Sequence, residues 1–111
     1  MEIIRHYLVL KIIESLLKDK ERINEMDIME KINKVQKKLC VNIINHSKID
    51  EKPYELIMVL KMMKIFDMVE IDGNGIKLTK KGKETIYSIE NTNTDLKKII
   101  YYLRDKIYEE V

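Results

Sequence analysis

The sequence is poor in the residues that build metal sites, disulfide frameworks and tight turns. It contains one cysteine and two histidines, too few for an intramolecular disulfide or a Cys-based zinc finger. Three glycines and one proline are too few for the many turns of a β-sandwich or β-barrel. Tryptophan and alanine are absent altogether. These absences exclude disulfide-rich domains and domains held together by structural zinc, and they argue against an all-β fold.

Long hydrophobic runs are also missing. No apolar stretch reaches the roughly 18 residues that a membrane-spanning helix needs. The first residues carry charges, and no small-residue cleavage site follows them, so the N-terminus does not resemble a signal peptide. We therefore expect a cytoplasmic protein that does not contact a membrane.

What the chain does contain is the apolar periodicity of helices, in a length that suits one domain. Its 111 residues are 45% hydrophobic and 36% charged, with a formal net charge of +2. Apolar residues recur at three- and four-residue steps in five segments. These segments predict helices over 2–18, 25–40, 52–66, 80–90 and 95–110. The first helix is expected to be amphipathic, with Arg5, Lys11 and Glu14 away from the core.

A β-hairpin is predicted between the third and fourth helices. Met68 to Ile71 and Ile76 to Thr79 read as strands, and Asp72 to Gly75 as a turn with two glycines that can adopt positive φ. Ile23 could contribute to a very short further strand. The expected fold class is therefore mainly α with a small β-hairpin (α+β).

The predicted order of elements, with three helices followed by a hairpin and another helix, resembles that of a winged helix-turn-helix domain. Two local motifs are also similar to that family. The stretch from Leu60 to Ile71 looks like a third helix running into the first wing strand, although Asp67 stands where glycine is usual. Leu78-Thr79-Lys80-Lys81-Gly82-Lys83 is similar to the leucine-threonine-x-lysine-glycine step that closes the wing in many bacterial and archaeal regulators. Thr79 is expected to cap the next helix, and Gly82 to allow close packing or a tight turn.

The resemblance covers residues 1–90 and implies double-stranded DNA binding, by a transcriptional regulator or a DNA-organising protein. In regulators of the PadR type and in small archaeal winged-helix proteins, the helix beyond the wing pairs two chains. Residues 94–111 are therefore expected to be a dimerisation element of a homodimer. Its expected interface residues are Leu96, Ile100, Tyr101, Leu103, Ile107 and Tyr108. The same residues could instead pack against the first helix of their own chain.

Positive charge is concentrated in two segments of the chain. Residues 31–49 contain five lysines and no acid, and residues 73–83 contain four lysines and no acid. In a winged helix both segments would lie beside the third helix and contact phosphates, with binding that depends on salt; either could also be an ordinary solvated face. The predicted DNA contacts are Lys34, Lys37, Lys38, Lys48, Lys52, Tyr54, Met58, Lys61, Asn74, Lys77, Lys80 and Lys81.

The third helix carries an unusual set of outward residues for a DNA reader. It has no Arg, Asn or Gln, the side chains best suited to bidentate base contacts. Glu55 could accept a hydrogen bond from a cytosine amine, and Met58 could touch a thymine methyl. Exposed Met58 and Met62 would equally suit a protein partner. The alternative function is therefore a protein-interaction module in a replication, transcription or partition assembly.

No constellation of residues indicates catalysis. His46, Ser47 and Asp50 are too close in sequence for a Ser-His-Asp triad, whose members come from separate segments. Cys40, at the end of the second helix, is expected to be a buried small apolar residue. The two-glycine turn lacks the strand-to-helix context of a phosphate-binding loop. We expect neither an enzyme nor a cofactor, metal or small-molecule ligand.

Overall fold

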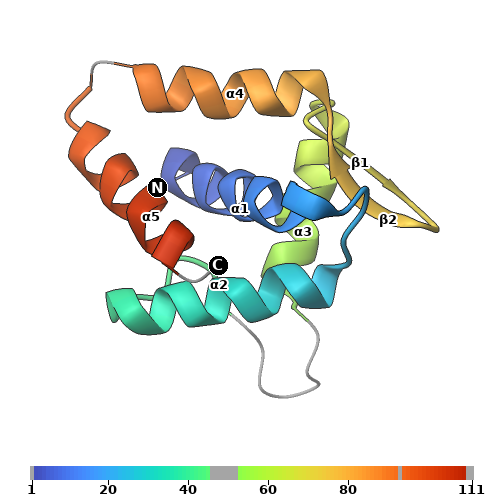
Figure 1. Ribbon diagram of the computed structural model, residues 1–111, viewed down its shortest axis with the longest axis horizontal. Coiled ribbons are helices and arrows are strands. Elements are labelled where there is room, and N and C mark those ends of the chain that lie inside the picture. Colours follow the sequence, from blue (N-terminus) through green and yellow to red (C-terminus); the bar gives the residue numbers. More distant parts are fainter. Residues whose placement is uncertain (1, 46–52, 93, 110–111) are drawn as a thin grey trace.

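The computed structural model describes residues 2–45, 53–92 and 94–109, and it is mainly helical with one small antiparallel hairpin (Figure 1), as the sequence predicts. The elements are α1 (Glu2–Leu16), the short 3-10 helix η1 (Leu17–Asp19), α2 (Glu25–Leu39), α3 (Tyr54–Ile65), β1 (Val69–Asp72), β2 (Gly75–Leu78), α4 (Lys80–Asn91) and α5 (Lys97–Glu109). The predicted helix bounds agree with these to within two residues.

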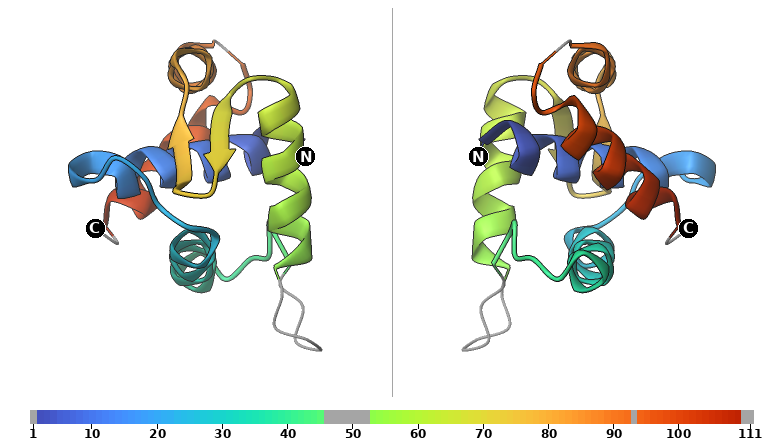
Figure 2. Two further views of the ribbon diagram at one scale, coloured as in Figure 1. Left: turned by 90° about the vertical axis from the view of Figure 1, so that its right-hand side faces the viewer. Right: turned by 90° about the vertical axis from the view of Figure 1, so that its left-hand side faces the viewer.

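Helix α1 is the centre of the molecule. Figures 1 and 2 show α2, α3, α4, α5 and the hairpin arranged around it, and α2, α4, α5 and β2 contact it directly. Every residue from Tyr7 to Ile13 is buried. The prediction of an amphipathic helix is wrong at Lys11, which is only 4% exposed. A helix covered on every side is normally apolar all round, so Lys11 needs buried partners.

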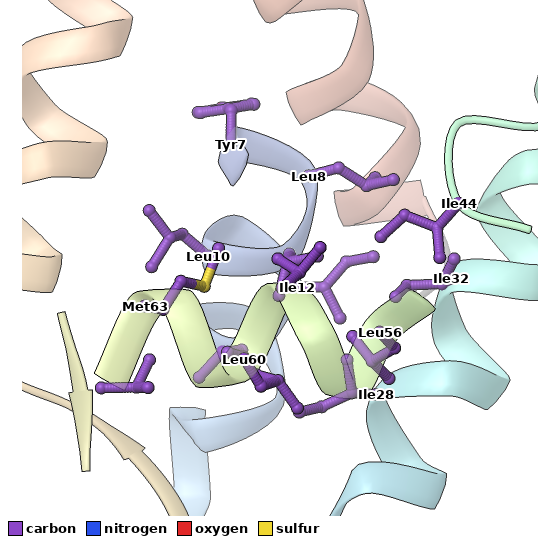
Figure 3. Packing of buried hydrophobic residues seen from close by; sticks show 14 of the residues in the cluster. Tyr7, Leu8, Leu10, Ile12, Ile28, Ile32, Ile44, Leu56, Leu60 and Met63 are labelled. Atoms are coloured by element: carbon purple, nitrogen blue, oxygen red, sulfur yellow. The ribbon is translucent and has the colours of Figure 1, made fainter. Parts of the chain in front are cut away.

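The core lies where α1 meets α2, α3 and the connection that follows α2 (Figure 3). Its largest fully buried side chains are Tyr7, Leu8, Leu10, Ile12 and Ile13 of α1, Ile28 and Ile32 of α2, Ile44 of the connection, Leu56, Leu60 and Met63 of α3, and Ile76 of β2. Because three helices and the hairpin share this core, the positions of α3 and the hairpin relative to α1 are fixed by packing.

Gln36 of α2 holds the connection that leads towards α3. Its Oε1 accepts hydrogen bonds from the N–H groups of Ile43 and Ile44, both at 2.6 Å, and its Nε2 donates to the Ile44 carbonyl at 3.0 Å. The buried amide thus satisfies backbone groups that would otherwise be left unpaired in the core. Ile44 is thereby held inside the core although it lies in a connection.

A polar cluster joins α1 to α4 and α5. Lys11 Nζ lies 2.7 Å from a Glu14 carboxylate oxygen, 3.1 Å from Glu90 and 5.1 Å from the centre of the Tyr108 ring. The Tyr7 hydroxyl donates to Glu90 at 2.6 Å. These contacts give the buried ammonium group of Lys11 the partners that its position requires.

The same contacts change two pKa values. Burial would lower the pKa of Lys11, but its hydrogen bonds to Glu14, Tyr108 and Glu90 raise it above its ordinary value. Burial and the hydrogen bond to Glu90 raise the pKa of Tyr7. Since both groups hold their protons more tightly in the folded chain, the cluster stabilises the fold fully below their ordinary pKa values. That stabilisation is lost as the pH rises above them.

The hairpin pairs β1 with β2 in antiparallel register, with Val69 opposite Leu78 and Ile71 opposite Ile76. The short strand predicted at Ile23 is confirmed as a single bridge to Ile76, with backbone hydrogen bonds of 3.0 and 2.7 Å. Of the two candidate glycines in the turn, Gly75 has the positive φ, at 124°. The Ile23 bridge ties the hairpin to the segment that precedes α2.

Two helices end in residues with left-handed backbone, Cys40 after α2 (φ 56°) and Asp67 after α3 (φ 62°). After α3, the Asp67 N–H donates to the Lys64 carbonyl and the Met68 N–H donates to the Met63 carbonyl. This Schellman pattern turns the chain directly into β1. The prediction of a buried Cys40 is wrong: the helix stops at Leu39, and Cys40 caps it at the surface.

The junction between β2 and α4 confirms the capping role of Thr79 and decides the role of Gly82. Thr79 Oγ1 accepts a hydrogen bond from the Gly82 N–H at 3.0 Å. Gly82 is a point of close packing rather than a turn, because a Cβ there would overlap the Met68 carbonyl oxygen and lie 3.1 Å from Leu78 Cδ2. None of the helices in the described ranges has the length and apolar character that a membrane crossing requires.

Gly82→Ala is expected to lower the free energy of unfolding by about 2–3 kcal/mol, because the added methyl forces α4 away from the hairpin. Gly73→Ala is the matched control, since nothing lies within 4 Å of a Cβ at that position; a change below about 0.5 kcal/mol is expected there. Denaturant unfolding measures both. Equal effects at the two glycines would contradict the close packing at Gly82.

Lys11→Met is expected to destabilise the fold by about 2–3 kcal/mol, because it keeps most of the side-chain volume but leaves Glu90 without its cation in a mostly buried position. Lys18→Met, at an exposed position of η1, serves as the control and should change stability by less than about 0.5 kcal/mol. Thermal and denaturant unfolding report the difference. A Lys11→Met variant as stable as the control would show that the cluster is dispensable.

Candidate nucleic-acid interface

Helix α3 has one face in the core and one face in solvent. The buried residues are Leu56, Val59, Leu60 and Met63; Ile57 is only half-buried. The opposite face presents Tyr54, Met58, Lys61 and Ile65, which follow one another at helical spacing and are all exposed. Met58 is 66% and Ile65 is 79% exposed, so the rest of the fold leaves this face uncovered.

The one acid of α3 is held away from that face. Glu55 Oε1 accepts a hydrogen bond from the Arg5 guanidinium at 2.9 Å, and its Oε2 accepts one from the Asn45 N–H at 3.0 Å. Both carboxylate oxygens therefore fasten α3 to α1 and to the connection after α2. These bonds hold the Glu55 carboxylate towards Arg5 and Asn45 rather than towards a cytosine amine.

The acids of the neighbouring hairpin are also matched by cations. Arg22 lies 3.2 Å from Asp72, and Lys77 lies 3.3 Å from Glu70. The predicted DNA contact Lys77 is therefore engaged within the hairpin. The charged side chains that stay exposed on α3 are Lys61 and Lys64, so the exposed face of this helix carries positive charge only.

The first turn of α4 lies beside the end of α3. The Thr79 hydroxyl donates to the Asp67 carbonyl at 2.5 Å, and the Thr79 N–H donates to the Met68 carbonyl at 3.1 Å. These bonds bring the exposed residues Lys80 and Lys81, both predicted DNA contacts, next to the C-terminal end of α3. Lys80 also lies 4.0 Å from Glu84, an ion pair at the surface that salt and solvent weaken.

The predicted lysines of α2 lie elsewhere. Figure 1 shows the last turn of α2 on the side of α5, and Lys38 Nζ lies 4.0 Å from Glu109 of that helix. Lys37 shares that last turn, and Lys34 pairs with Glu30 at 3.7 Å. Within the described residues, the lysines of α2 and those of α4 therefore do not form one continuous surface around α3, because the last turn of α2 lies beside α5 while α4 begins next to α3.

The turn of the hairpin lies alongside α3. The left view of Figure 2 shows the two strands beside this helix, with their turn directed towards the end at which α3 begins. Asn74 is exposed in that turn, and its N–H donates to the Asp72 carboxylate at 2.8 Å. Lys48 and Lys52, the remaining predicted contacts, lie outside the described residues.

The apolar residues along one side of α5 pack against other helices of the same chain. Ile100, Leu103 and Ile107 are buried, and α5 packs against α1, α2 and α4. Packing within the chain, the alternative considered from the sequence, accounts for these three residues, which cannot also line a dimer seam while α5 stays docked. Leu96 and Tyr101 are partly buried, and Tyr108 is half-exposed beside Lys11.

Three exposed residues of α3, Met62, Lys64 and Ile65, were not among the predicted DNA contacts; Met62 was expected only as a possible contact to a protein partner. The exposure of Ile65 could have been predicted from the sequence. Once Leu56, Leu60 and Met63 are assigned to the core, helical geometry places position 65 opposite them, in line with Met58. An isoleucine just before a strand is more easily assigned to the core, which hid this exposed position.

The described residues hold no group of three or more His, Cys, Asp or Glu side chains that could bind a metal ion. No protein-family model matches the chain, and no curated protein and no solved structure matches it significantly. The properties of the exposed α3 face are therefore the basis for a functional assignment.

Proposed function

We propose that this chain is a winged helix-turn-helix protein that binds double-stranded DNA through the exposed face of α3. Three local features support the winged-helix assignment. Ile23 adds a third, one-residue strand to the hairpin. Asp67 occupies, with positive φ, the place where the resemblance leads one to expect glycine, the residue that adopts this conformation without steric cost. Gly82 permits the close hairpin-to-helix junction.

The observation that carries DNA binding is the charge and exposure of α3 taken together. The helix is exposed along its outer face, Lys61 and Lys64 are its exposed charges, and its one acid is held by Arg5. A helix of this kind fits the major groove of B-DNA, and lysines at its edges neutralise phosphates. Lys80 and Lys81 extend the positive surface at the end of α3.

In this arrangement the parts of the site have separate roles. Helix α3 enters the major groove, and the hairpin turn with Asn74 lies next to the adjoining backbone. Lys61, Lys64, Lys80 and Lys81 contact phosphates, which positions the protein but carries no sequence information. The lysines of α2 lie outside this contact.

A second candidate function has an observation of its own. Met58, Met62 and Ile65 of α3, and Phe66 directly after it, are between 43% and 79% exposed. Contiguous exposed apolar residues are typical of protein-binding surfaces, and Met adapts to irregular partners. A protein partner that uses this face would bind with little dependence on salt, which separates it from DNA.

The expected homodimer stays a prediction, with a changed set of interface residues. Since Ile100, Leu103 and Ile107 are buried within the chain, a seam along α5 would have to use its exposed residues, Ile99, Tyr102 and Tyr108. In a symmetric dimer each copy would present the same patch, and two α3 helices would address two half-sites.

The double variant Lys61→Gln/Lys64→Gln is expected to bind a generic duplex more weakly than the wild type, because two phosphates are no longer neutralised. The slope of log affinity against log salt should become shallower by about 2, at roughly 0.9 for each of these phosphates. Fluorescence anisotropy across a salt series measures both affinity and slope.

Lys37→Gln/Lys38→Gln is the matched control, because it removes the same charge from the last turn of α2, beside α5. Its slope should stay that of the wild type. If the control reduces the slope as much as the α3 variant does, the phosphate contacts do not centre on α3. If the wild type binds no duplex at low salt, the DNA proposal fails and the protein-binding alternative takes its place.

A further inference from the structure

The exposed face of α3 offers a DNA duplex almost no hydrogen-bonding side chain for reading bases. The helix contains no Arg, Asn, Gln, Ser or Thr. Glu55 is engaged through both oxygens with Arg5 and Asn45. Of the residues that this face presents, Met58 and Ile65 are apolar, and Tyr54 and Lys61 carry the hydrogen-bonding groups. Paired hydrogen bonds from this face are limited to those that Lys61 can donate to guanine O6 and N7, so most of the face has to read bases by apolar contact.

The major groove has one apolar feature that distinguishes bases, the C5-methyl group of thymine. Adenine, guanine and cytosine carry no methyl group at that edge. A long, unbranched and polarisable Met side chain can lie against such a methyl group without a fixed geometry. The exposed side chains of Met58, Met62 and Ile65 therefore match the chemistry of a thymine-bearing groove.

We infer that α3 distinguishes DNA sequences by apolar contact with thymine methyl groups, with Met58 as the main specificity-determining residue. This inference rests on the proposed DNA binding. Met58 lies on the N-terminal half of α3, the part of a recognition helix that meets base edges, and it is 66% exposed. Ile65 and Met62 extend the apolar surface towards the end of the helix.

Charge favours a duplex over a protein as the occupant of this face. Lys61 and Lys64 lie beside the apolar side chains, the nearby first turn of α4 adds Lys80 and Lys81, and Glu55, Glu70 and Asp72 are each paired with a cation. Asp67, exposed where α3 ends, offsets part of this positive charge. Apolar side chains beside lysines complement a groove that has methyl groups on its floor and phosphates along its edges.

The test compares duplexes that differ only in the methyl group. A duplex of alternating adenine and thymine is measured against the same duplex with deoxyuridine in place of thymine. The wild type should bind the thymine duplex at least about fourfold more tightly, the factor that corresponds to burial of one methyl group. A duplex of alternating guanine and 5-methylcytosine should likewise bind more tightly than its unmethylated form, because its methyl group occupies the same place in the groove.

Two variants assign the preference to Met58. Met58→Ala should bring the thymine-to-uracil ratio close to one while the salt slope stays unchanged, since every lysine that meets a phosphate is still present. Ile99→Ala removes an exposed apolar side chain from α5, on the opposite side of the molecule from α3 in Figure 1, and should keep the wild-type ratio.

The possible results distinguish a failure of this inference from a failure of the proposed DNA binding. Salt-dependent binding with no preference for thymine over uracil, or with the same preference in Met58→Ala, overturns the inference and leaves DNA binding intact. No binding to any of the duplexes overturns both. A preference that Ile99→Ala abolishes and Met58→Ala retains would place the reading face on α5 and overturn the assignment to α3.

Discussion

The burial of α1 is the constraint on which the rest of the structure depends. A helix with every residue from Tyr7 to Ile13 removed from solvent needs neighbours on all sides, and α2, α3, α4, α5 and the hairpin supply them. Lys11 restricts how the other helices can pack around α1, because its buried ammonium group has to contact the carboxylates of Glu14 and Glu90. The position of α4, which carries Glu90, is thus coupled to the same helix that orders the core.

This arrangement determines what α3 can present to a partner. Leu56, Leu60 and Met63 are used in packing near α1, and the Arg5–Glu55 ion pair fastens the first turn of α3 to the same helix. The other face of α3 is left to solvent beside the hairpin. A rigid helix with one free face, held by a core and flanked by a hairpin, can be placed in a groove without reorganisation of the protein.

The sequence predicted the elements well because they follow from local signals. Apolar periodicity located the helices, the two-glycine turn located the hairpin, and Thr79 and Gly82 marked the start of α4. What it could not predict depends on tertiary packing. Lys11 looked like a surface residue because its partners, Glu90 and Tyr108, lie far along the chain. Charge counting grouped the lysines of α2 with those of α4, although the direction of α2 carries Lys37 and Lys38 to the side of α5. The apolar stripe of α5 has the same spacing whether it meets a second chain or α1.

The central claim is that the exposed face of α3 is the surface that meets DNA, and methyl NMR tests it most directly. The chain can be labelled with carbon-13 at its methionine and isoleucine methyl groups and titrated with a duplex. The account predicts that the resonances of Met58, Met62 and Ile65 shift, while that of Ile99 on α5 stays in place. Shifts confined to α5, or no shifts under conditions of low salt, would contradict it.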